Sequence, residues 1–97
     1  MLKRRFKSEK EFKDYFFGPN AERELIFDFI VKSIEIAVNE NKDTADFAEI
    51  VIDGDTLDIK CERPEFKSNL QNALDFYVEN EIYEKCKNVQ TLIDKLS

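Results

Sequence analysis

The sequence contains no histidine and no tryptophan, and only two glycines and two prolines among its 97 residues. Without histidine the chain lacks the commonest general base and the commonest metal ligand, and Ser-His and Cys-His nucleophilic pairs are impossible. Two isolated glycines cannot build a glycine-rich phosphate-binding loop. We therefore expect a protein that is not an enzyme and that has no cofactor and no metal site.

The two cysteines, Cys61 and Cys86, are too few for a disulfide framework and lack the paired spacing of a zinc site, so we expect two reduced thiols. No uninterrupted apolar run exceeds three residues, which predicts no membrane span. No apolar stretch follows the basic residues near the N-terminus, as a signal peptide would require. These features predict a cytoplasmic protein. The frequent Lys, Glu, Asn, Ile and Phe suggest an AT-rich genome, such as that of a low-GC bacterium or a phage.

The chain has enough apolar residues for one core, with 42% hydrophobic residues and 12 aromatic side chains. Its patterns predict an α+β fold: a mostly helical single domain, residues 1–97, in the order α-α-β-hairpin-α-α. In this fold an antiparallel two-stranded hairpin packs on the helices.

The first predicted helix runs from about Glu9 to Phe17. Ser8 and Glu11 have the spacing of a capping box, and Gly18 suits a left-handed position at the helix end, before Pro19. Three phenylalanines would share its buried face: Phe12, Phe16 and Phe17. Leu2 and Phe6 would fall on the same arc if the helix extended backwards through Ser8.

A second helix, N-capped by Asn20, should end at about Asn39 or Asn41. It carries a broad apolar stripe made of Ile26, Phe27, Ile30, Val31, Ile34, Ala37 and Val38, and a second stripe made of Leu25, Phe29 and Ile36. A helix this apolar is either central to the fold or part of an interface.

The segment from Phe47 to Cys61 is the clearest hairpin signal. Its turn is either Asp53-Gly54 as type I′ or Gly54-Asp55 as type II′. Both registers place the same set inward: Ala48, Ile50, Ile52, Leu57, Ile59 and Cys61. The other face would carry Phe47, Glu49, Val51, Thr56, Asp58, Lys60 and Glu62, and be mostly solvated.

Pro64 suits the first turn of a third helix. The apolar stripe of residues 66–77 is rotated by more than about 100° from that of residues 82–96. We therefore expect either a break around Glu79–Tyr83 or a last helix that leaves the core to contact something else.

Charge is unevenly distributed along the chain. Residues 1–13 contain six basic and two acidic residues, whereas the rest contains nine basic and nineteen acidic residues, for a net charge of −6. An acidic body repels the phosphate backbone and so disfavours nucleic-acid binding on the main surface. The basic segment, represented by Lys3, Arg4, Arg5 and Lys7, would contact nucleic acid, a membrane surface or the acidic body of the chain itself.

The acidic residues from Glu40 to Asp58 are interrupted only by Lys42. They are either a solvated surface or a docking patch for a basic partner, and the candidate patch residues are Asp46, Glu49, Asp53, Asp55 and Asp58. The aspartates of the turn do not have the spacing of a calcium-binding loop.

These features favour a small acidic protein-binding module, such as an inhibitor, an immunity-type protein or a phage-encoded regulator. The alternatives are an assembly subunit of a larger complex and a nucleic-acid contact through the basic segment. Surplus apolar residues further predict a homodimer or a tight complex with a partner protein. The candidate self-association residues are Leu25, Phe29, Ile36, Ile82, Val89, Ile93 and Leu96.

Overall fold

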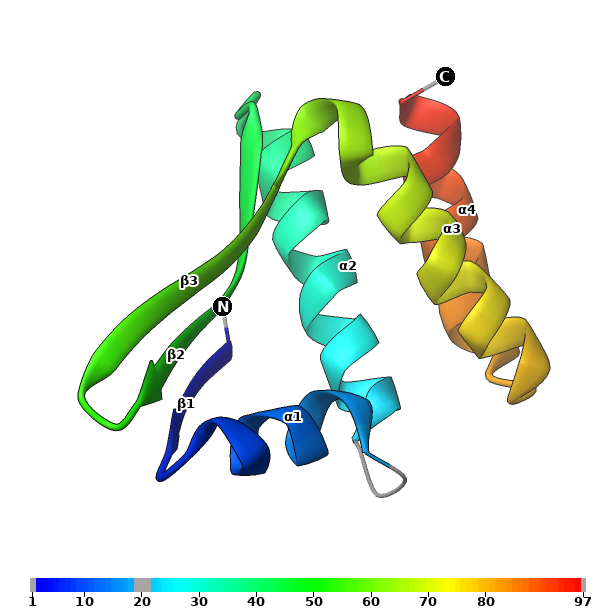
Figure 1. Ribbon diagram of the computed structural model, residues 1–97. Coiled ribbons are helices and arrows are strands. Elements are labelled where there is room, and N and C mark those ends of the chain that lie inside the picture. Colours follow the sequence, from blue (N-terminus) through cyan, green and yellow to red (C-terminus); the bar gives the residue numbers. More distant parts are fainter. Residues whose placement is uncertain (1, 19–21, 97) are drawn as a thin grey trace.

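The computed structural model describes residues 2–18 and 22–96, in which four helices lie on one side of a three-stranded sheet (Figure 1). The elements are β1 (Leu2–Phe6), α1 (Glu9–Phe17), α2 (Arg23–Asn39), β2 (Thr44–Ile52), β3 (Asp55–Glu62), α3 (Arg63–Glu79) and α4 (Tyr83–Lys95). The α+β class agrees with the sequence prediction. The predicted element order and the two-stranded hairpin need correction, because the hairpin is part of a mixed sheet in the order β1-β2-β3.

Strand β1 is the main departure from the predicted order. It pairs in parallel with β2, from Leu2 opposite Ala48 to Phe6 opposite Ile52. Leu2 and Phe6 are both buried. A separation of four residues places two side chains on one face of a strand as well as on one face of a helix, so their spacing alone did not distinguish the two.

Helix α1 begins as predicted and ends differently. The Ser8 hydroxyl accepts a hydrogen bond from the Glu11 backbone N–H at 3.3 Å, which confirms the N-cap. Gly18 is not left-handed, since its φ is −75°. Glycine is favoured at this position because the backbone passes close to the carbonyl oxygen of Asp14, with which a Cβ would collide. The predicted cap at Asn20 lies outside the described residues.

The hairpin turn is the type I′ alternative. Ile52 pairs with Asp55, and both intervening residues have positive φ, 47° at Asp53 and 87° at Gly54. Ile50 faces inward and is fully buried, as predicted, but Leu57 is 46% exposed. Leu57 lies on an edge strand that curves away from α3 and α4 toward the hairpin tip (Figure 1).

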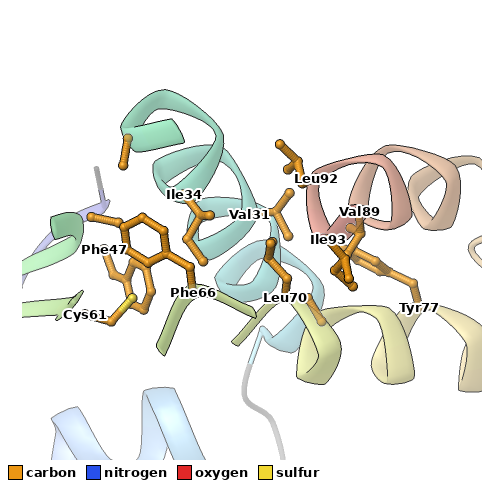
Figure 2. Close-up of a cluster of buried hydrophobic side chains, with 13 residues drawn as sticks. Val31, Ile34, Phe47, Cys61, Phe66, Leu70, Tyr77, Val89, Leu92 and Ile93 are labelled. Atoms are coloured by element: carbon orange, nitrogen blue, oxygen red, sulfur yellow. The ribbon is translucent and has the colours of Figure 1, made fainter. Parts of the chain in front are cut away.

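A bulge corrects the predicted facing of Phe47. The pairing register shifts between Asp46 and Ala48, so one extra residue is inserted in β2. This shift lets both Phe47 and Ala48 be buried, although strict alternation would send one of them outward. Phe47 packs with Cys61 and Phe66 in the core (Figure 2).

The break predicted around Glu79–Tyr83 is confirmed, and α4 turns back along α3. Glu81 has a left-handed conformation with φ 58°, and the Ile82 backbone N–H donates to the Tyr77 carbonyl at 2.8 Å. This is a Schellman motif, and α2 ends with the same motif at Asn41. The last helix therefore packs on the core rather than leaving it.

The buried side chains form two clusters rather than one. The larger cluster joins α2, α3, α4 and the base of the hairpin, and Figure 2 shows Val31 and Leu70 at its centre. The smaller cluster consists of Leu2, Phe6, Ala48 and Ile50, with aromatic side chains of α1 packed against it. Ile59 packs against both. The sheet thus supports two hydrophobic clusters side by side.

Candidate functional site

The predicted acidic patch is spread over the hairpin. Asp53 and Asp55 lie at its tip, and Glu49 and Asp58 are opposite each other on the outer face of the sheet. Asp46 lies beyond the bulge and pairs with Lys60. The structure therefore brings Glu49 and Asp58 together, but it separates Asp46 from the tip.

The basic segment lies along the same sheet. Lys3 is the strand partner of Glu49, and Arg5 is the partner of Val51, so both lie on the outer face. Arg4 has its guanidinium 5.5 Å from the ring centroid of Tyr15 on the inner side. Lys7 directly follows the strand and is exposed. Of these four basic residues, Lys3 is the one whose strand partner is acidic.

The predicted self-association residues do not form one surface. Val89 and Ile93 are buried in the larger cluster (Figure 2). Ile82 and Leu96 are partly buried and pack against it. Phe29 packs against the smaller cluster, so α1 and β1 cover part of the second stripe of α2. Leu25 is half-buried and Ile36 is 43% exposed. The expectation that α4 presents an exposed apolar stripe is therefore corrected.

A polar cluster joins α2, α3 and α4. The buried Tyr77 hydroxyl donates to an Asp28 carboxylate oxygen at 2.6 Å, and Lys85 Nζ donates to Asp28 at 2.9 Å and to Glu24 at 2.7 Å. Burial, followed by the hydrogen bond to Asp28, raises the pKa of Tyr77 above its ordinary value. The phenol therefore stays protonated and keeps its hydrogen bond to Asp28. This arrangement fits a clamp between helices better than an acid–base site.

Both cysteines are free thiols. Burial, with a smaller contribution from the Glu65 carboxylate, raises the pKa of the Cys61 thiol to about 11. A thiol with a raised pKa is a poor nucleophile. Cys86 Sγ donates to the carbonyl of Ile82, the N-cap residue of α4.

An apolar space that is not filled by side chains lies between the two hydrophobic clusters. It is a groove of about 570 Å³ that we term the apolar groove. Its floor is formed by Leu2, Phe47, Ala48 and Ile59 of the sheet. One wall is formed by Phe12, Phe16 and Phe17 of α1, and α2 contributes Ile26, Phe27, Phe29 and Ile30. On α3, Phe76 stacks on Phe27 with ring centroids 4.9 Å apart.

The aromatic side chains of α1 are partly exposed, although the sequence predicted that Phe12, Phe16 and Phe17 are buried. None of the described residues of α1 is buried, and Phe17 is 75% exposed at the lip of the groove. An exposed phenylalanine beside an apolar groove indicates a binding surface more strongly than an isolated exposed phenylalanine does.

Polar side chains line the groove only at its rim. They are Arg23 of α2 and Asn72, Asp75 and Glu79 of α3, and all four are exposed. The other described lining residues are apolar. A shallower depression adjoins the groove, shares Arg23 and Phe76 with it, and adds Glu22, Glu24 and Asp28.

The groove was not predicted from the sequence. Its residues come from six elements, β1, α1, α2, β2, β3 and α3, and they lie together only because β1 pairs in parallel with β2. The available signal was the excess of aromatic residues on the first two predicted helices, which was assigned to burial and to self-association instead.

Comparison of this chain with protein-family models, with curated proteins and with solved structures found no match. In the part of the chain that the structure describes, no helix is long and apolar enough to cross a membrane. Nor do three potential metal-ligating side chains come together among those residues.

Proposed function

We propose that this protein is a small acidic module that acts by binding a partner protein, in a regulatory or inhibitory role. The apolar groove is the observation that carries the proposal. It is concave, lined by aromatic and aliphatic side chains, and about 570 Å³ in volume, within the roughly 300–1,000 Å³ typical of binding sites.

The exposed Phe17 supports the same proposal. A large aromatic side chain that is 75% exposed loses contact with water only when something covers it. Aromatic anchors at a pocket edge commonly supply much of the binding energy of a protein interface. The groove and Phe17 therefore suit a protein partner better than the outer face of the sheet does. On that face the acidic residues are interleaved with Lys3, Arg5 and Lys60.

The carboxylates near β1 disfavour the alternative function, in which the basic segment binds nucleic acid. Lys3 lies opposite Glu49, which in turn lies opposite Asp58, so two carboxylates lie on the paired side of the basic edge strand. Such neighbours weaken attraction to a phosphate backbone.

The test is affinity capture from the native host followed by reconstitution with purified candidates. A partner protein should bind stoichiometrically in calorimetry and should co-migrate with the chain in size-exclusion chromatography. If the purified chain binds no host protein but binds host RNA or DNA in a salt-dependent way, the protein-binding function is wrong.

A further inference from the structure

The interior of the apolar groove restricts the kind of ligand that it can accept. Its polar side chains are all at the rim, and the remaining described lining residues, such as Ile30 and Phe47, offer no hydrogen-bonding side chain. A ligand with unpaired polar groups would lose hydrogen bonds to water there without replacement, at a cost of roughly 1–3 kcal/mol for each group. The ligand surface that enters must therefore be apolar.

An α-helix meets this requirement for a polypeptide ligand. Its backbone N–H and C=O groups bond to each other, so a helix brings an apolar face with no unsatisfied backbone group in its middle. An extended segment would instead present its backbone groups to Phe27, Phe76 and their neighbours. Helix-in-groove binding through apolar residues three and four positions apart is a recurrent mode of recognition.

The charge at the rim indicates what flanks the apolar face of the ligand. Asp75 and Glu79 are one turn apart on the same side of α3, and neither has a salt bridge within the described part of the chain. The adjoining depression adds Glu22, also without a salt bridge among the residues described. Opposed to these three carboxylates is Arg23. The rim is thus complementary to a cationic ligand.

We propose that the apolar groove binds an amphipathic α-helix of the partner protein, whose apolar face is flanked by lysine or arginine. This inference rests on the proposed protein-binding function and adds the binding surface and the chemistry of the ligand. The apolar face covers Phe17 and fills the space between the two hydrophobic clusters, while the basic flank meets Asp75 and Glu79.

Synthetic peptides of about four helical turns, roughly 14 residues, test the proposal. One peptide has Leu at helical spacing and Lys elsewhere. A second replaces Lys with Glu, and a third interrupts the first with proline. Binding is measured by fluorescence anisotropy, and its location by amide chemical-shift changes in the ¹⁵N-labelled protein. We expect the Lys peptide to bind at least about tenfold more tightly than either of the others, with the largest shifts in α1, α2 and α3.

Matched variants separate the groove from the rest of the surface. Phe17→Glu should weaken Lys-peptide binding about tenfold, whereas Tyr83→Glu, at a 62% exposed aromatic outside the groove, should leave it unchanged. The double reversal Asp75→Lys with Glu79→Lys should also weaken it. The same reversal at Glu49 and Asp58 of the outer face should have a smaller effect.

Other outcomes would overturn the proposal. Shifts centred on the hairpin tip, or a larger loss from the outer-face reversal, would assign binding to the sheet and leave the protein-binding function standing. A groove that takes up the dye anilinonaphthalene sulfonate but neither helical peptide would be a small-molecule site. Groove shifts that depend on protein concentration alone, with dimers in sedimentation, would make the ligand a second copy of this chain.

Discussion

Tyr77→Phe tests whether the polar cluster of α2, α3 and α4 stabilises the fold. The Tyr77 side chain is 1% exposed, and its hydroxyl donates to Asp28 at 2.6 Å. A hydrogen bond to a charged acceptor contributes roughly 1.5–3 kcal/mol. Asp28 keeps its bonds to Lys85 in the variant and is 37% exposed, so water partly replaces the hydroxyl. We therefore expect a loss near the lower end, about 1.5 kcal/mol, measured by urea unfolding at pH 7.

Asp28→Ala should cost more than Tyr77→Phe. It leaves the buried Tyr77 hydroxyl without its acceptor and removes one of the two carboxylates that pair with Lys85. An unpaired buried hydroxyl costs roughly 1–3 kcal/mol in addition to the lost contacts. The exposed Tyr83 is the control, because Tyr83→Phe should change stability by less than about 0.5 kcal/mol. If Asp28→Ala costs no more than Tyr77→Phe, the hydrogen bond does not stabilise the fold as argued.

The same cluster predicts a pH dependence with a definite sign. Because burial and Asp28 raise the pKa of Tyr77, the folded chain holds a proton that the unfolded chain releases above about pH 10. The contribution of this proton to stability is therefore complete below that pH and is lost as the pH rises further. The raised pKa values of Lys85 and Cys61 act in the same direction. In Tyr77→Phe the free energy of unfolding should fall less steeply above about pH 10 than in the wild type, but it should still fall. If the slope of stability against pH is the same in both proteins, Tyr77 does not cause the alkaline loss of stability.

Three further outcomes follow from the structure. Glu81→Gly should stabilise the chain by up to about 1 kcal/mol in urea unfolding, because Glu81 has φ 58° and only glycine adopts this conformation without strain. Ile50→Ala should cost roughly 2–5 kcal/mol at its fully buried position, whereas Leu57→Ala should cost under about 1 kcal/mol at its 46% exposed one. A maleimide reagent followed by mass spectrometry should label the half-buried Cys86 before the buried Cys61.

Local chemistry was sufficient to predict several elements. The Ser8 cap and Pro64 in the first turn of α3 depend on residues close in sequence and were predicted, and the Asp53-Gly54 turn is one of the two turns that the sequence allowed. The break before Tyr83 was visible in the rotation between two apolar stripes. These features do not require knowledge of a distant partner.

The missed features depend on contacts between distant residues. Leu2 and Phe6 become strand residues because β2, more than forty residues later, pairs with them. The burial of Phe47 needs a bulge that no glycine marks. The return of α4 passes through Glu81, a residue type that seldom adopts a left-handed conformation, so the sequence there did not indicate which way the last helix goes.

The fold brings together charged residues that are far apart in the sequence. Parallel pairing of β1 with β2 makes Lys3 a neighbour of Glu49, so basic and acidic residues that are separate along the chain lie side by side on the outer face of the sheet. The carboxylates that remain without a described salt bridge include Asp75 and Glu79, at the edge of the same groove where Phe17 is exposed. Apolar surface and uncompensated negative charge therefore coincide at one place in the fold, although neither is concentrated there in the sequence. A binding partner that uses both must carry apolar and basic groups on one face, and this requirement follows from the tertiary structure alone.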